Sequence, residues 1–309
     1  MNAPDQIHRY MNAEGTFRML AARGTNAVSK GVSFCHTSPA VTATFGELLI
    51  GAALLQYAQG PGERFQLQLE HSGSAGVMVA EVRPGPVIRG RVQFPRGGAL
   101  LPTDVPFKEP ATVHVTRQPD PAFVRNGQRY QSSAPVQGGR VDTALQQFVL
   151  ESEQVLSVFS LVCVPGGEGE VKVAGGLVVQ ALPGWEREHL VAVTSALEAI
   201  DYAELVRSGV DPLDAADRVL APIGSKLIGT DSLEYRCRCS KETAARVVGM
   251  LEKDELRHLA QGGMEVVVCE FCGTSYEVRQ ADLPAASIDT AEGTAEDTTV
   301  VAETPISKG

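Results

Sequence analysis

Four cysteines in the last quarter of the chain constrain its fold more than any other feature. They form two close pairs: one residue separates Cys237 from Cys239, and two residues separate Cys269 from Cys272. Four thiolates without a histidine at ligand spacing favour Zn²⁺ in a closed tetrahedral site. The sequence therefore predicts a small zinc-folded domain near the C-terminus, with one Zn²⁺ per chain.

The composition indicates an ordinary globular protein. The chain has 309 residues, of which 43% are hydrophobic and 21% charged, enough for one sizeable core and a smaller second unit. No apolar run approaches the length of a membrane span, the longest being 48–55 and 155–164. The first residues lack the basic and apolar regions of a secretory signal, so we expect a cytoplasmic protein. In a reducing compartment, clustered cysteines are expected to bind metal or to be redox-active.

Charge and motif content argue against several partners. The formal net charge is −10, which disfavours a nucleic-acid partner because phosphates would be repelled. The glycine-rich stretch at 165–170 lacks both a dinucleotide fingerprint and a P-loop lysine. We therefore expect no nucleic acid, no nucleotide and no membrane among the partners.

Residues 1–183 have the pattern of a mixed α+β domain. Residues 46–55 have the composition of a buried helix, and 65–70 and 77–82 have the pattern of two strands joined by a turn. The other elements expected here are a short helical entry at 9–19, a strand at 113–115, a helix at 141–153 and a buried strand at 155–164.

Residues 184–230 are predicted to form a helical linker. An apolar stripe with spacings of three and four begins at Leu190 and ends at Ile200. A second helix is expected to start at Asp211-Pro212, with Asp as the cap and Pro at the first helical position. These helices have no core of their own, so we expect the linker to depend on its neighbours for stability.

Residues 231–281 are predicted to be the zinc-binding unit. Short helices are expected at 241–251 and 254–261, and a hairpin of 264–268 and 274–278 is expected to flank the second cysteine pair. The remaining residues, 282–309, are acidic and almost without large apolar side chains, which predicts a disordered tail.

The two cysteine pairs differ in geometry. Cys269 and Cys272 resemble a zinc knuckle, with Gly273 free to adopt the required backbone angles. In an extended Cys237-Arg238-Cys239 the two thiols share one face, and a disulfide between them would be strained. We therefore expect Cys269 and Cys272 to oxidise first. The alternative interpretation of the same four cysteines is a purely structural zinc site that folds the small domain and takes no part in redox chemistry.

The other two cysteines are weaker candidates. Cys35 is followed by His36, but adjacent residues of a strand face opposite ways and no third orienting group is evident. Cys163 lies inside an apolar run and is predicted to be inert core. A structural role is the preferred interpretation for both.

The motifs together resemble those of the redox-regulated heat-shock chaperones called the 33 kDa chaperonin family. The match rests on Cys237-x-Cys239-Ser240, Cys269-x-x-Cys272-Gly273 with Tyr276, Gly46-Glu47-Leu48-Leu49, Arg89-Gly90, Ser152-Glu153-Gln154 and Ala174-Gly175-Gly176 leading to Gln180-x-Leu182-Pro183. The resemblance covers about residues 5–282.

This resemblance implies an ATP-independent holdase and not an enzyme. The family's reduced, zinc-bound form is inactive. Oxidants form the Cys269–Cys272 disulfide, zinc leaves, the linker unfolds, and the Cys237–Cys239 disulfide follows. The oxidised protein then forms a homodimer and binds unfolding or misfolded client proteins.

Two other functions remain as alternatives. A thiol-disulfide oxidoreductase would use Cys269 and Cys272, but such enzymes usually have the first cysteine at a helix N-terminus, whereas the residues after Cys272 are strand-like. A constitutive zinc-ribbon interaction module would keep its zinc in the presence of peroxide.

Overall fold

The computed structural model describes residues 3–35, 37–60, 62–73, 75–94, 107–120, 128–137, 139–167 and 169–284. The chain divides into two compact units, Met1–Cys237 and Arg238–Gly309. Both contain helices and strands, so the predicted mixed helix-and-sheet fold class is confirmed. The finer boundaries at 183, 230 and 281 stay a prediction.

The first unit contains two sheets. The five-stranded sheet has the order β10-β1-β2-β9-β8 and consists of β1 (Gln6–Met11), β2 (Phe17–Arg23), β8 (Ser157–Pro165), β9 (Val171–Ala181) and β10 (Lys226–Ser232). The six-stranded sheet has the order β11-β5-β4-β3-β6-β7 and consists of β3 (Glu63–His71), β4 (Val77–Arg83), β5 (Val87–Gln93), β6 (Ala111–Pro119), β7 (Tyr130–Val136) and β11 (Glu234–Tyr235). All described pairings are antiparallel except the parallel pairing of β11 with β5.

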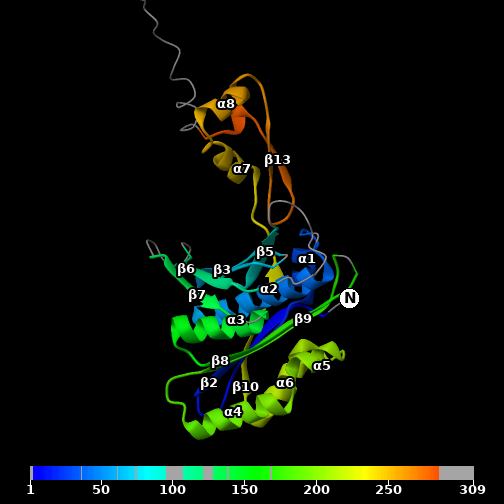
Figure 1. Ribbon diagram of the computed structural model, residues 1–309, viewed down its shortest axis with the longest axis vertical. Helices are drawn as coiled ribbons and strands as arrows, with labels where there is room; N and C mark the ends of the chain where they lie inside the picture. The colour runs from blue at the N-terminus through cyan, green and yellow to red at the C-terminus, as the bar shows by residue number, and fades with distance from the viewer. Residues whose placement is uncertain are drawn as a thin grey trace, which may run out of the picture. The chain divides into compact units, whose positions relative to one another are not determined.

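Helices cover the sheets in layers (Figure 1). The helices between the two sheets are α1 (Thr25–Val32), α2 (Pro39–Gln59) and α3 (Val141–Phe148), and α3 continues into a π-helical turn, Val149–Glu153. Their apolar side chains and those of both sheets form the main core. A second core lies on the opposite face of the five-stranded sheet, beneath α4 (Arg187–Ala199), α5 (Tyr202–Arg207) and α6 (Pro212–Leu220).

Helix α2 is the central element of the main core. By length and composition alone it could cross a membrane, so the expectation that no apolar segment approaches that length is wrong. However, 78% of its most apolar window is buried inside the protein. A helix that is apolar on all sides is expected where it is enclosed on all sides, as α2 is between the two sheets.

The predicted helix at 9–19 is wrong, because this segment forms β1, a turn and β2. The turn closes where the side chain of Asn12 accepts a hydrogen bond from the backbone N–H of Phe17 at 2.8 Å. Gly15 has φ +69°, a left-handed conformation that favours glycine. The other predicted elements of residues 1–183 are confirmed within α2, β3, β4, β6, α3 and β8.

The predicted helical linker contains a strand as well as helices. Its helices are confirmed, with the side chain of Asp211 capping α6 at the N–H of Leu213. Strand β10, however, spans the predicted end of the linker and pairs with β1. The partners are more than 200 positions apart in the sequence, so local periodicity could not reveal this pairing. A 3₁₀ turn at Ala221–Ile223 connects α6 to β10.

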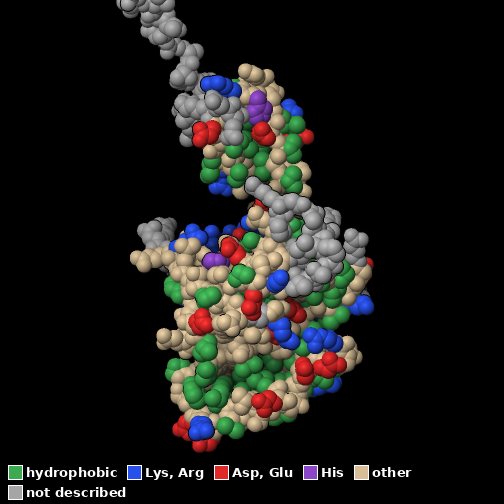
Figure 2. All heavy atoms as spheres, viewed as in Figure 1, with side chains coloured by type: hydrophobic (Ala, Val, Ile, Leu, Met, Phe, Trp, Pro, Cys, Tyr) green, Lys and Arg blue, Asp and Glu red, His purple; other side chains and the backbone are tan. Residues whose placement is uncertain are grey.

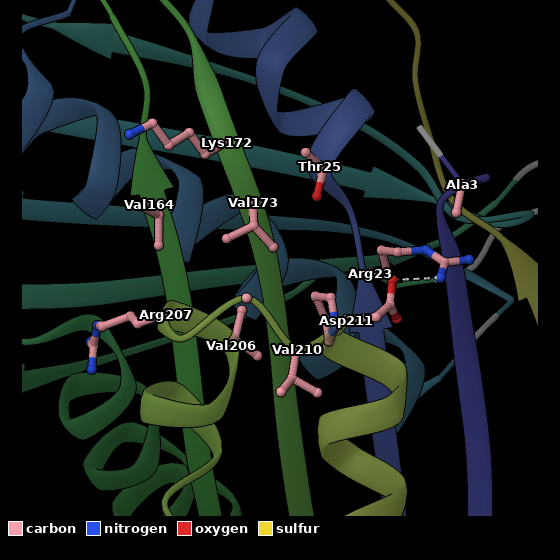
Figure 3. Close-up of a pocket in the computed structure, with 12 residues that line it drawn as sticks. Ala3, Arg23, Thr25, Val164, Lys172, Val173, Val206, Arg207, Val210 and Asp211 are labelled. Atoms are coloured by element: carbon pink, nitrogen blue, oxygen red, sulfur yellow. Dashed lines mark hydrogen bonds and ion pairs between the residues drawn. The ribbon is translucent and has the colours of Figure 1, made fainter. Parts of the chain in front are cut away.

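Polar contacts also attach α6 to the five-stranded sheet. Arg23 of β2 forms an ion pair with Asp211 at 2.8 Å (Figure 3). The hydroxyl of Tyr10 in β1 donates to Asp217 at 2.7 Å. The helices of the linker are thus held by the sheet beneath them, as expected for helices without their own core.

The second unit is small. It contains α7 (Lys241–Val248), α8 (Lys253–Ala260), the hairpin of β12 (Glu265–Val268) and β13 (Ser275–Val278), and a 3₁₀ turn at Gln280–Asp282. Both predicted helices and the predicted hairpin are confirmed. Its core consists of Ala244, Ala245, Val248, Leu256, Leu259, Val278 and Leu283. Leu283 therefore belongs to this core and not to the predicted tail, of which residues 285–309 lie outside the described residues.

Candidate metal centre

The second cysteine pair lies in the tight turn between β12 and β13. The backbone N–H groups of Cys272 and Gly273 both donate to the carbonyl of Cys269, at 3.3 and 2.8 Å, and the N–H of Cys269 donates to the carbonyl of Thr274 at 2.9 Å. Gly273 has φ +68°. This is the backbone geometry expected of a zinc knuckle, in which both thiols leave the same side of a turn.

The first pair lies in an extended segment with an anchor at each end. On one side, β11 pairs with β5 and the N–H of Arg236 donates to the carbonyl of Ile88 at 3.1 Å. On the other side, Ser240 caps α7 by accepting the N–H of Thr243 at 3.2 Å. Cys237 therefore lies shortly after a strand of the first unit, and Cys239 lies shortly before a helix of the second unit.

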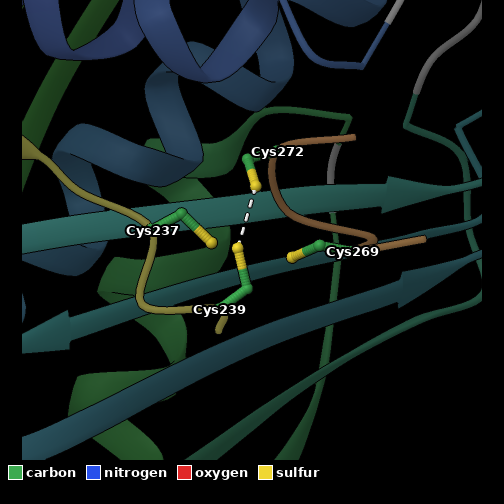
Figure 4. Close-up of side chains that lie close together, drawn as sticks. All are labelled: Cys237, Cys239, Cys269 and Cys272. Carbon is green, nitrogen blue, oxygen red and sulfur yellow. Dashed lines mark hydrogen bonds between the residues drawn. The ribbon is translucent and has the colours of Figure 1, made fainter. Parts of the chain in front are cut away.

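The four thiols converge. The sulfurs of Cys237, Cys239, Cys269 and Cys272 all lie within 4.8 Å of one another (Figure 4). Cys239 and Cys272, from different pairs, have their sulfurs 3.3 Å apart. None of the four forms a disulfide, and each is half-buried. Zn–S bonds of about 2.3 Å would place tetrahedral sulfurs roughly 3.8 Å apart, so the donor set and its spacing fit a Cys₄ zinc site.

Two hydroxyl groups contact these sulfurs, and the sequence alone gave them no role. The hydroxyl of Tyr276 donates to the Cys239 sulfur at 3.1 Å, and the hydroxyl of Thr274 lies 3.2 Å from the Cys272 sulfur. The bond to Cys239 raises the pKa of Tyr276 to about 12, so the hydroxyl keeps its proton and donates. Alternation along the strand predicted at 274–278 is the signal that could have found them, because residues 274 and 276 of such a strand share one face.

A charged donor contacts the first pair as well. The guanidinium of Arg89 in β5 hydrogen-bonds the Cys237 sulfur and also pairs with Glu81 across β4 and β5. Hydrogen bonds to ligand sulfurs are the means by which the surroundings of a metal tune its ligands. Cys237, Cys239 and Cys272 each have an identified side-chain neighbour of this kind.

The remaining cysteines lie outside this cluster. Burial raises the pKa of the Cys35 thiol, which also accepts a backbone hydrogen bond from Val92. Burial raises the pKa of Cys163 as well, and its thiol donates to the carbonyl of Thr42 in the main core. A thiol with a raised pKa is a poor nucleophile, which supports a structural role for both. His36, the proposed base beside Cys35, lies outside the described residues.

A pocket of about 420 Å³ lies where the loop between α5 and α6 meets β2 and β9 (Figure 3). The charged ends of Lys172 and Arg207 point away from Val173 inside the pocket. Arg23 is already paired with Asp211. The pocket therefore lacks a convergent set of polar groups and is not a candidate active site.

The backbone around Cys269 does not favour an oxidoreductase. Cys269 to Cys272 form a turn, and β13 follows. Such enzymes lower the pKa of the first cysteine by placing it at the N-terminus of a helix. The described residues contain no helix that begins at Cys269.

Known proteins with similar sequences and folds agree on one family. The family model described as "Hsp33 protein" matches residues 5–279. The chain is 30% identical to the 33 kDa chaperonin of Thermus thermophilus, covering 88% of this chain and 83% of the relative. It is 27% identical to the 33 kDa chaperonin of a Thermoanaerobacter species, covering 90% and 96%.

A solved structure has the same fold. The crystal structure of the 33 kDa chaperonin (heat shock protein 33 homolog) from Thermotoga maritima superposes with a TM-score of 0.77 at 23% identity, covering 94% of this chain and 100% of that one. The family match extends across both sheets, the helices α4 to α6 and all four clustered cysteines. On this evidence the chain belongs to the Hsp33 protein family.

Proposed function

We propose that this protein is a redox-regulated, ATP-independent holdase chaperone of the cytoplasm that binds unfolding proteins under oxidative stress. The observation that carries the proposal is the convergence of four reduced thiols from two separate pairs within 4.8 Å. Cys237, Cys239, Cys269 and Cys272 are the proposed ligands of one Zn²⁺. Bound zinc supplies most of the folding free energy of small domains of this kind, about 10 to 16 kcal/mol.

Oxidation of the thiols removes the ligands. Cys269 and Cys272 lie on a turn whose geometry suits a disulfide, so this pair is proposed to close first and Cys237–Cys239 second. With peroxide, one thiolate attacks the O–O bond to give a sulfenic acid and hydroxide. The other thiolate then attacks that sulfur and displaces the second hydroxide, so that two electrons pass from the two sulfurs to the two peroxide oxygens.

Loss of the zinc fold is proposed to release the helical linker and expose apolar surface. Figure 2 shows apolar side chains gathered on the first unit over β8 and α4. Large apolar side chains that are already exposed in this part of the chain include Leu156, Val158, Trp185 and Val191. Exposed apolar patches of this kind mark surfaces that bind other proteins. The oxidised form is proposed to act as a homodimer on unfolded clients, without nucleotide or nucleic acid and without enzymatic turnover.

One sample can test the proposal. The reduced protein is expected to hold one zinc and to leave the aggregation of a denatured client unchanged. Peroxide with mild heat is expected to release the zinc and to suppress aggregation without ATP, as measured by a zinc-binding dye and by light scattering. Activity that does not follow the zinc state would overturn the switch. Zinc that stays bound in peroxide would favour a constitutive zinc module instead.

A further inference from the structure

We propose that a cleft between the C-terminal end of α2 and the strands β10, β1 and β2 binds a small carboxylate that carries an apolar chain. The cleft has a volume of about 320 Å³ and is lined by Arg9, Arg18, Leu20, Tyr57, Ile228 and Asp231. All six residues belong to the first unit. The inference goes beyond the proposed function, because it involves neither the thiols nor a client protein.

Arg18 of β2 is a half-buried cation that has no carboxylate partner in the part of the chain that the structure describes. Its Nη2 atom donates to the carbonyl of Ala58, near the end of α2, and to the side chain of Gln180 at 2.7 Å. A helix C-terminus offers only about half a negative charge. The Nε atom of Arg18 is buried and has no hydrogen-bond acceptor, which costs free energy. A carboxylate in the cleft would supply both an acceptor and a full negative charge.

The second arginine of the cleft is already paired. Arg9 of β1 forms an ion pair with Asp231 of β10 at 3.1 Å. A Cβ at Gly229 would collide with the guanidinium of Arg9, so this group lies against the backbone of β10. Burial and the charge of Asp231 raise the pKa of Tyr57 to about 12, so its hydroxyl keeps a proton to donate. Two guanidinium groups and one carboxylate give the cleft a net charge of +1, which suits a monoanion.

Leu20 and Ile228 form the apolar side of the cleft. The register of β1 with β10 shifts between Arg9 and Tyr10, so that Ile228 has no partner on β1. Bulges of this kind redirect side chains and are frequent beside functional sites. Ile228 is 55% exposed, and an apolar chain bound in the cleft would cover it. A ligand with both an anionic group and such a chain would therefore bridge β10 to β2 and α2.

The test uses octanoate as the probe and the reduced full chain as the protein. Calorimetry should show one octanoate bound per chain. Octanol lacks the charge and inorganic phosphate lacks the chain, so each should bind at least about ten-fold more weakly. Bound octanoate should also slow hydrogen exchange in β10, because it stabilises the folded state of the strand that it contacts. Neither measurement involves oxidation or a client, so the result is independent of the proposed function.

Substitutions test the residues assigned to the cleft. Arg18→Gln should weaken octanoate binding about ten-fold or more, the loss expected for a charged hydrogen bond. Asp231→Asn should strengthen binding, because it removes a repelling charge and releases Arg9. Ile228→Glu should abolish binding while the protein stays folded, since this side chain is exposed. Leu227→Glu introduces the same charge at an adjacent exposed residue that does not line the cleft, and should bind octanoate like the wild type.

Several results would overturn the assignment. Octanoate that does not bind, or octanol or phosphate that binds as tightly, would show that the cleft has no preference for an apolar carboxylate. Binding that survives Ile228→Glu, or that leaves the exchange of β10 unchanged, would place the ligand elsewhere. Arg18 also holds the end of α2, so Arg18→Gln is expected to lower the stability. If that variant does not fold, the opposite effects expected for Asp231→Asn and Ile228→Glu decide, and weaker binding by Asp231→Asn would contradict the proposal.

Discussion

At the scale of single residues, Glu47 is a partly buried carboxyl group whose pKa departs from its ordinary value. It lies in α2, the central helix of the main core. Burial, reinforced by the negative charge of Asp142, raises the pKa of Glu47 to about 7, although Arg140 and Arg207 oppose the shift. A carboxyl group with a raised pKa binds a proton more tightly in the folded than in the unfolded state.

The first prediction concerns the pH dependence of stability. The ordinary pKa of a glutamate is 4.5, so between pH 4.5 and about 7 unfolding releases a proton from Glu47. The free energy of unfolding should therefore fall as the pH rises through this window. Glu47→Gln is expected to melt at a higher temperature than the wild type above pH 7, and at a similar temperature near pH 4.5. Thermal unfolding across this range measures the difference.

The exposed Glu188 of α4 provides the control. Glu188→Gln should not reproduce the change seen in Glu47→Gln, because its side chain is exposed and lies outside the main core. A Glu47→Gln protein that differs from the wild type by the same amount at all pH values would contradict the assigned pKa.

Residue-level features were predictable where the chemistry is local. The Asp211 cap and the conformation of Gly273 depend on neighbours a few positions away, and the sequence predicted both. The Tyr276–Cys239 contact joins positions 37 apart, and the environment of Glu47 combines three elements. Such contacts exist only after the chain has folded, so neither composition nor spacing revealed them.

At the scale of elements, the contact of α6 with the five-stranded sheet depends on Gly175. A Cβ at this position of β9 would lie 2.5 Å from the Cβ of Pro212, the first residue of α6, and 2.9 Å from the backbone oxygen of Ala22 in β2. Neither the proline ring nor a carbonyl inside a sheet can move easily. The glycine therefore allows the linker helix to lie directly on the strand.

Gly175→Ala is accordingly expected to push α6 away from the sheet. Overpacking of this kind costs about 1 to 3 kcal/mol. Hydrogen exchange should become faster in residues 187–220 of the reduced protein while its zinc remains bound. If the proposed function is correct, this variant should also suppress client aggregation partially without an oxidant.

A substitution at a second glycine, Gly46, serves as the control for Gly175→Ala. Gly46→Ala would place a methyl group 2.4 Å from the Cys163 sulfur, between α2 and β8 in the main core. It should lower the melting temperature without selectively loosening residues 187–220. If Gly175→Ala loses zinc, or if its linker is as protected as that of the wild type, the role assigned to Gly175 is wrong.

Sequence periodicity predicted some helices and strands correctly and others incorrectly. The repeat in 187–199 and 212–220 predicted α4 and α6 correctly, because amphipathic helices carry their signal locally. In the segment at 9–19, a turn at Asn12 and Gly15 joins β1 to β2 in place of the predicted helix. Strand β10 forms by pairing with the edge of β1. This pairing is not visible in the local sequence pattern of either strand.

At the scale of the whole molecule, the two units differ in what stabilises them. The first unit has two extended cores on either side of a five-stranded sheet. Among the described residues, the fully buried core of the second unit consists of a few alanine, valine and leucine side chains, with Val267 and Tyr276 packed against it. Small units with so little apolar burial usually need a metal or disulfides to remain folded. We therefore expect the fold of the second unit to depend on the zinc that the four thiols are proposed to bind.

Removal of zinc under reducing conditions tests this difference. A chelator is expected to unfold residues 241–278, because the proposed ligands lose the ion that holds the knuckle to the extended pair. Strands β1, β2, β8 and β9 should remain protected, since their cores contain no ligand. Hydrogen exchange measured by mass spectrometry distinguishes the two regions, and added zinc should restore protection. Cys269→Ser should resemble the chelated protein, whereas Cys35→Ser should resemble the zinc-loaded wild type. If residues 241–278 stayed protected without zinc, their small core would be sufficient by itself, and oxidation of the thiols could not act by unfolding this unit.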